Sequence, residues 1–77
     1  MDVKAAARMT EPFVLFLTAY TTCQAVSAEH LRDMLTRIQS GEITGEKAHR
    51  WLGWVQGVLC ARGAGSLEEF KAVNHQA

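Results

Sequence analysis

The sequence predicts an all-α fold: a helical hairpin of one long helix and one shorter antiparallel helix, followed by a short third helix. Three observations support this prediction. Between positions 13 and 38, eight residues, six of them apolar, recur at alternating intervals of four and three, which is the spacing of one helix face. Residues 13–39 contain neither glycine nor proline. Helix-capping patterns also precede the second and third predicted helices.

The first predicted helix runs over residues 12–39, about 28 residues or roughly 42 Å. Thr10–Pro12 marks its start, because threonine can cap a helix and proline is tolerated in the first turn. A break at Ser27–Glu29, where serine could cap a new helix, is the alternative. Residues 2–8 are expected to be frayed or to form a separate short helix. The spaced face consists of Phe13, Leu17, Tyr20, Gln24, Ser27, Leu31, Met34 and Ile38.

The second and third helices are predicted over residues 45–62 and 66–74, within a single domain of 77 residues. Gly41 can end the first helix in the left-handed conformation, and Thr44 can cap the second. The second helix ends at the glycines of the segment 63–65. The next segment, Ser66–Glu69, has the spacing of a capping box, in which serine and glutamate side chains bond reciprocally to the backbone.

Gly53 and Gly57 are unusual within the second helix, since each mid-helix glycine costs about 1 kcal/mol. A helical wheel places them away from the face that is predicted to pack on the first helix. We therefore predict a flat groove that admits another backbone or a flat ligand, with the alternative that both glycines simply face water. The predicted binding residues are Arg50, Gly53, Trp54, Gln56 and Gly57. The predicted packing face comprises Ala48, Trp51, Leu52, Trp54, Val55, Val58, Leu59 and Ala61.

The long helix is also predicted to pair with a second copy. The second helix reaches back only to about Thr22, which leaves the apolar N-terminal part of the first helix uncovered. A homodimer, or a higher oligomer, that forms a four-helix bundle would cover it. The polar residues Gln24 and Ser27 interrupt the apolar face and would fix the register. The predicted self-association residues are Phe13, Phe16, Leu17, Tyr20, Gln24 and Leu31.

Composition excludes several classes of protein. Eight basic residues balance eight acidic ones, so a general nucleic-acid binder is not expected. The uncharged span 12–28 contains several polar residues and is short for a bilayer crossing, so no membrane association is expected. Asp2 and Glu11 give the N-terminus mixed charge, unlike a secretion signal. Cys23 and Cys60 are expected to be free, buried thiols in a reducing compartment, the cytoplasm, although a disulfide between them stays open.

No pattern in the sequence points to catalysis. No nucleophile motif, phosphate-binding loop or metal-ligand spacing occurs, so we expect neither an enzyme nor a metal or cofactor site. The turn 63–65, with Lys47, Arg50, Arg62 and Trp54, offers at most a weak anion site. The glycine-rich second helix is also unlike the recognition helix of a helix-turn-helix motif.

The segment 46–74, EKAHRWLGWVQGVLCARGAGSLEEFKAVN, resembles the C-terminal part of small proteins of tailed phages and prophages. Such proteins largely lack an assigned activity, so the resemblance implies an origin rather than a mechanism. The matching positions are Arg50–Gly53, Gln56, Gly57, Leu59, Gly63, Ser66, Leu67, Glu69 and Lys71.

Small phage proteins often bind and inhibit a host factor. We therefore predict a non-enzymatic, phage-encoded helical protein that blocks a host protein, either a defence system or a regulator, in the bacterial cytoplasm. Two alternatives stay open: an oligomeric sponge that sequesters a nucleotide signal near Arg50 and Trp54, and a structural module of a phage complex.

Overall fold

A computed structural model describes all residues, 1–77, and confirms the predicted all-α class: it contains no strand. Its principal dimensions are 30 × 26 × 17 Å. The α-helices are α1 (Val3–Thr10), α2 (Ala28–Gln39), α3 (Gly45–Ala61) and α4 (Leu67–Gln76). Two 3₁₀-helices, η1 (Glu11–Phe16) and η2 (Gln24–Val26), lie between α1 and α2.

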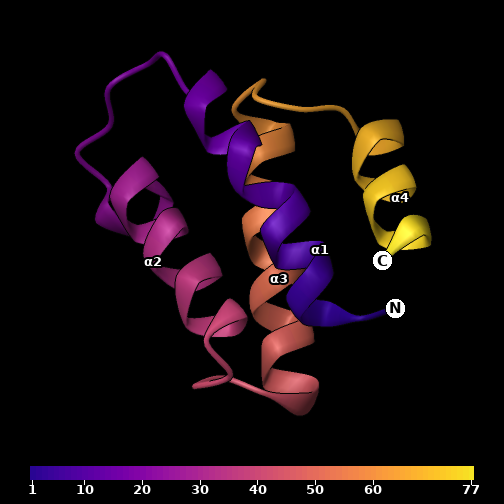
Figure 1. Ribbon diagram of the computed structural model, residues 1–77. Coiled ribbons are helices and arrows are strands. Elements are labelled where there is room, and N and C mark those ends of the chain that lie inside the picture. The colour runs from indigo at the N-terminus through magenta and orange to yellow at the C-terminus, as the bar shows by residue number, and fades with distance from the viewer.

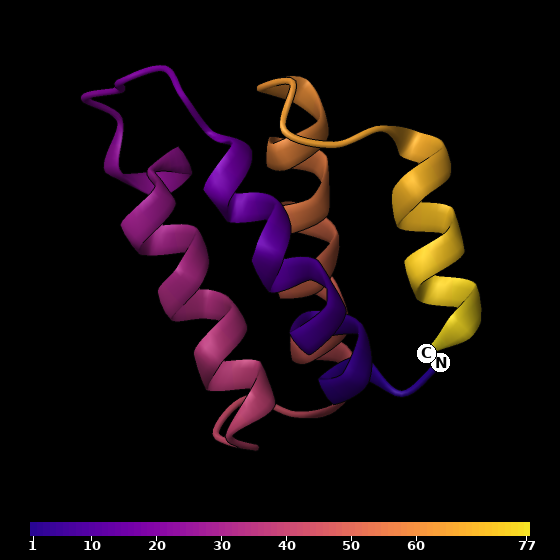
Figure 2. The same ribbon diagram turned by 45° about the horizontal axis from the view of Figure 1, so that its top comes forward.

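Helix α1 lies centrally and contacts each of the other three α-helices (Figure 1). Its residues Ala6 and Ala7 are fully buried, and their small side chains let the neighbouring helices approach closely. The two chain ends meet beside α4, where the Asp2 amide donates to the Ala77 carbonyl at 2.9 Å (Figure 2). The segment that was expected to be frayed or a short helix is therefore a short helix at the centre of the fold.

The prediction of one long helix over residues 12–39 is wrong. The chain breaks where the alternative placed the break: Ser27 is the N-cap of α2, and its hydroxyl accepts from the His30 amide at 3.1 Å. Thr10 precedes η1 as its N-cap, but its side chain makes no capping hydrogen bond, because the buried hydroxyl donates back to the Ala6 carbonyl at 2.7 Å. A continuous helix of roughly 42 Å would project beyond a body whose longest dimension is 30 Å. Folding the segment back instead buries Val14.

Helices α3 and α4 lie within two residues of their predicted bounds. Gly41 has a φ of +83° after α2, as expected for a left-handed glycine at a helix end. Ser66 and Glu69 form the predicted capping box, in which each side chain accepts from the other residue's amide. Thr44 is the N-cap of α3, although its side chain makes no capping hydrogen bond.

The core lies between α1, α2 and α3, and α4 adds Phe70 and Val73 to it. The predicted packing face of α3 is partly correct. Trp51 is half-buried beneath Arg37 and Lys47, whose charged groups lie 5.1 and 5.4 Å from its ring centroid, whereas Trp54 and Ala61 are exposed. The buried apolar residues of α3 are Ala48, Leu52, Val55, Val58 and Leu59.

Candidate functional site

A groove of about 420 Å³ runs between α3 and α4. The two helices pack chiefly through α1 rather than directly against each other, so the space between their outer faces stays open. Because only five residues separate the end of α3 from the start of α4, the turn between them fixes the width of the groove at that end. Its lining residues are Gly53, Gln56, Gly57, Cys60 and Ala61 of α3, and Leu67, Phe70, Lys71 and Asn74 of α4.

The two glycines of α3 lie on this groove and make no close contact within the chain. A Cβ atom built on Gly53 or Gly57 would meet no atom within 4 Å. Packing within this chain therefore does not require glycine at either position. With Ala61 one turn further on, they form a strip of small residues on the exposed side of α3, which we call the small-residue strip.

Gln56 was predicted to bind a partner, but the structure gives it an internal role. Only 7% of its surface is exposed. Its amide nitrogen donates to Thr10 (3.1 Å) and to the side-chain oxygen of Asn74 (2.8 Å), and its oxygen accepts from the Asn74 amide (2.9 Å). These bonds join α1, α3 and α4 beneath the groove. The position of Gln56 at the edge of the apolar face of α3 was the one sequence signal for this role.

Arg50 and Trp54 were predicted to share a site with the two glycines, but they lie outside the groove. Arg50 is exposed and makes no hydrogen bond or ion pair. Trp54 is 48% exposed, and its indole nitrogen donates to the Ala25 carbonyl at 3.3 Å. No enclosed space is formed by the pair, so the geometry lends no support to a nucleotide site there.

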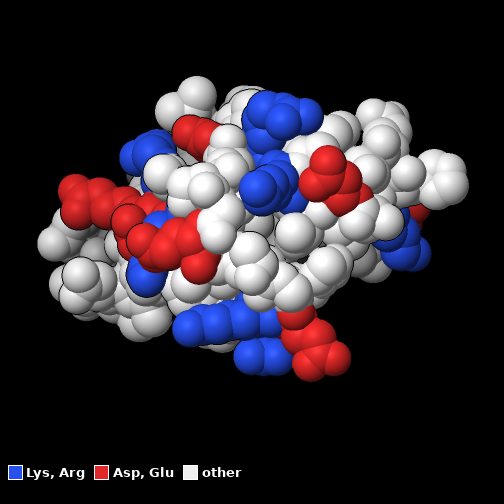
Figure 3. Space-filling model, turned by 60° about the horizontal axis from the view of Figure 1, so that its bottom comes forward, with Lys and Arg blue, Asp and Glu red and all other residues white.

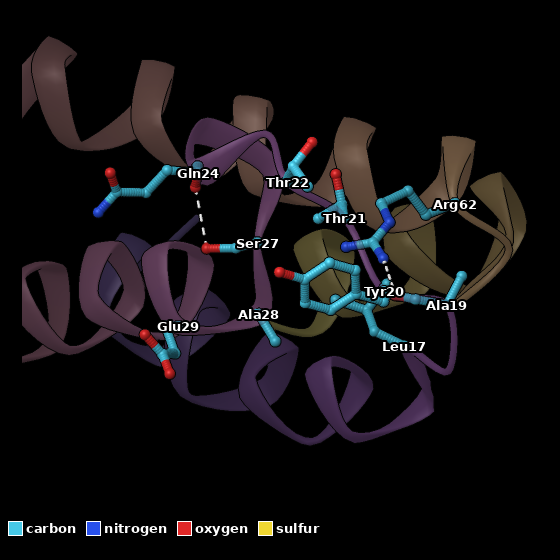
Figure 4. A pocket seen from close by; sticks show the side chains of 10 residues that line it. All are labelled: Leu17, Ala19, Tyr20, Thr21, Thr22, Gln24, Ser27, Ala28, Glu29 and Arg62. Atoms are coloured by element: carbon cyan, nitrogen blue, oxygen red, sulfur yellow. Dashed lines mark hydrogen bonds between the residues drawn. The ribbon is translucent and has the colours of Figure 1, made fainter.

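Arg62 has a structural role that sequence reasoning did not assign. Its guanidinium donates to the carbonyls of Val26 (2.7 Å) and Ala19 (2.5 Å) and so ties the irregular segment between η1 and α2 to the end of α3. A hollow of about 490 Å³ opens beside these bonds, where Tyr20 and Thr21 surround the guanidinium (Figure 4). Both terminal nitrogens of Arg62 donate to backbone carbonyls, so the guanidinium is held by contacts within the chain itself.

The predicted self-association residues fall into three groups. Leu31 is fully buried in the core of its own chain, so its prediction as a contact residue is wrong for this fold. Phe13 and Leu17 are half-buried, and the Phe13 ring lies 4.8 Å from that of Phe70. The remaining three residues, Phe16, Tyr20 and Gln24, are exposed.

Exposed apolar side chains gather in and around the irregular segment. Leu15 is 76% exposed, Phe16 is 63% exposed and Tyr20 is 90% exposed. Phe16 borders the turn 63–66, and Leu67 beyond that turn is exposed as well. A concentration of apolar surface at one end of a small domain is typical of an interaction site.

Charged side chains form no comparable concentration on the surface. On the face in Figure 3, basic and acidic side chains are interspersed rather than separated. Glu42 forms a hydrogen bond with Arg37 that raises the pKa of the guanidinium, which stays charged. No three His, Cys, Asp or Glu side chains are grouped as metal ligands would be. None of the helices has the length and apolarity to span a bilayer.

Both cysteines are free, as predicted, but they are exposed rather than buried. Cys60 lies in the groove, and Cys23 lies in the irregular segment. Each of the two candidate surfaces, the groove and the apolar surface at the irregular segment, therefore carries one thiol that a reagent can label.

Comparisons of the chain with protein-family models, curated proteins and solved structures found no match. Function must therefore be argued from the groove and from the apolar end of the molecule.

Proposed function

We propose that this chain is a non-enzymatic interaction protein that binds an α-helix of a partner protein in the groove between α3 and α4. The observation that carries the proposal is the small-residue strip: two glycines inside a long, well-packed helix, both open to solvent and neither required by the fold. Their cost of about 1 kcal/mol each is offset if a partner helix packs against them.

The shape of the groove suits a helix. Helix axes normally pack 8–10 Å apart, and glycine or alanine at the contact permits closer approach of the two backbones. Leu67, which is 59% exposed, would form one wall of the occupied groove and become buried. Lys71 at the rim could contact an acidic side chain of the partner.

The resemblance to small phage proteins supports a host protein as the partner, blocked by occlusion of its own binding surface. Binding between two macromolecules needs about 800 Å² from each partner for a standard interface. The groove alone is small for this purpose. We propose that the exposed apolar end, around Phe16 and Tyr20, pairs two copies of this chain, so that a dimer presents two grooves to the partner.

Gly57→Leu tests the groove. The new side chain has open space within the chain, so the variant should fold with unchanged or slightly raised stability while losing the partner. Ala72→Leu is the matched control, because it adds the same side chain to an exposed position on the opposite side of α4. Tagged variants would be used to capture proteins from a bacterial lysate, with quantification by mass spectrometry. Equal capture by wild type and Gly57→Leu would reject the groove as the binding surface.

A further inference from the structure

The segment that joins residues 1–16 to the rest of the chain has a sequence pattern that its conformation does not use. We call residues 17–27 the hinge and residues 1–16 the arm. The hinge contains only the three-residue helix η2, yet the four-three spacing of Phe13 to Ile38 continues through it without glycine or proline. The sequence is therefore compatible with a continuous helix at this point.

The hinge is attached weakly to the body. Trp54 of α3 and Arg62, the residue that follows α3, contact its backbone through three hydrogen bonds, two from Arg62 and one from Trp54. None of its residues is buried. Tyr20 in particular projects almost entirely into solvent. Leu17 and Val26 of the hinge pack half-buried against the core, so extending the hinge would give up these two contacts and the three hydrogen bonds but would remove no fully buried residue.

We propose that two copies of this chain associate by exchanging their arms, with each hinge straightened into a helix that joins η1 to α2. In this dimer the arm of one copy occupies, on the body of the other, the place that it holds here on its own body. The proposal rests on the self-association suggested above and specifies how it occurs. Arm exchange is a low-cost route to dimers because it reuses contacts that already exist.

The arm contacts that would be reused are specific. Glu11 accepts from the Gln39 amide at 2.8 Å, Thr10 accepts from Gln56, and Phe13 packs on Phe70. Each of these contacts joins the arm to residues beyond the hinge. They form equally well within one copy or between two, so exchange leaves their number unchanged.

The straightened hinges would add a contact that the single copy lacks. A continuous helix of roughly 42 Å extends past the 30 Å body, so the two projecting hinges would lie antiparallel against each other. Symmetry about Thr22 places Tyr20 of one copy opposite Gln24 of the other, consistent with the heptad spacing. Residues 12–28 carry no charge, so the pairing brings no like charges together. The exposed side chains of Tyr20 and Phe16 would become partly buried in this pairing.

A cross-link distinguishes exchange from ordinary surface pairing. In a Cys23→Ser, Cys60→Ser background, Glu11→Cys and Gln39→Cys place one thiol in the arm and one in the body, at side chains that touch here. The protein would be refolded at high concentration, sized by light scattering and treated with a short bis-maleimide. Exchange predicts a dimer whose two chains are covalently joined on a denaturing gel. A dimer with cross-links only within chains would overturn exchange but leave self-association intact.

Two substitutions at the exposed residue Thr22 provide the matched test. Thr22→Ala raises helix propensity in both hinges and should tighten the dimer roughly 5- to 10-fold. Thr22→Pro cannot continue a helix and should weaken the dimer at least about a thousandfold. Circular dichroism of the diluted monomer checks that each variant is folded. A dimer unaffected by Thr22→Pro overturns exchange, and a wild-type chain that is monomeric at every concentration overturns both exchange and self-association.

Discussion

Residues 13–27 and helix α3 present opposite cases of helix formation. Residues 13–27 contain no glycine or proline, yet they form only 3₁₀ turns and irregular backbone. Helix α3 contains two internal glycines, yet it is an unbroken helix of 17 residues. The difference shows that local preference does not decide the outcome in a chain of this size.

Burial explains the difference. Helix α3 places six residues in the interior, spread along most of its length. In residues 13–27, Val14 is the one buried side chain. Burying a large aliphatic side chain contributes roughly 1.5–3 kcal/mol, which exceeds the cost of a mid-helix glycine. Helix α3 forms despite its glycines because it is well packed, whereas residues 13–27 lack comparable packing.

The largest expected effect comes from removing that packing. Leu59→Ala in α3 should destabilise the fold by about 2–5 kcal/mol, because the side chain is fully buried and leaves a cavity. Phe16→Ala, at an exposed residue of η1, is the counterpart within residues 13–27 and should change stability by less than about 0.5 kcal/mol. Urea unfolding of the two variants measures both. Similar losses would contradict the assignment of stability to α3.

A smaller effect is expected from the bonds that hold the hinge. Arg62→Ala removes both guanidinium bonds to the hinge carbonyls and should cost about 1 kcal/mol of local stability. Cleavage by chymotrypsin after the exposed Tyr20 should then accelerate about fivefold. Arg50→Ala is the control, because this exposed arginine of α3 makes no hydrogen bond or ion pair. Equal cleavage of both variants would show that Arg62 does not restrain the hinge.

The smallest expected effect on stability tests whether the fold itself requires the glycines. Gly53→Ala should stabilise the fold by about 0.5–1 kcal/mol, since the new methyl group meets no atom within 4 Å. Gly65→Ala should do the reverse, because its Cβ would lie 2.6 Å from the Phe70 ring. Thermal unfolding would measure both variants. A destabilised Gly53→Ala variant would mean that the fold itself requires this glycine.

Several elements could be predicted because their signals are local. The capping box at Ser66 needs only residues three apart, and the end of α2 at Gly41 needs only a backbone that tolerates positive φ. The amphipathic spacing of α3 placed Leu52, Val55 and Leu59 correctly in the core.

The candidate site was predicted less completely. The two glycines do face outward and line a groove, but its second wall comes from α4, which a wheel of α3 cannot show. Gln56 is internal because Thr10 and Asn74 meet it from other helices, so its role depends on contacts distant in sequence. Arg62 binds carbonyls more than thirty residues earlier, and no motif signals such a bond.

The sequence by itself determined the helical class, the bounds of α3 and α4, and the outward position of the two glycines, because periodicity and capping act over a few residues. Tertiary structure decided the rest: that α1 occupies the centre, that residues 11–27 fold back, and that α4 completes the groove. The physical reason is burial. A periodic apolar face shows that a segment can pack as a helix, whereas the surface that covers this face depends on the whole chain. In the hinge, no side chain becomes fully buried.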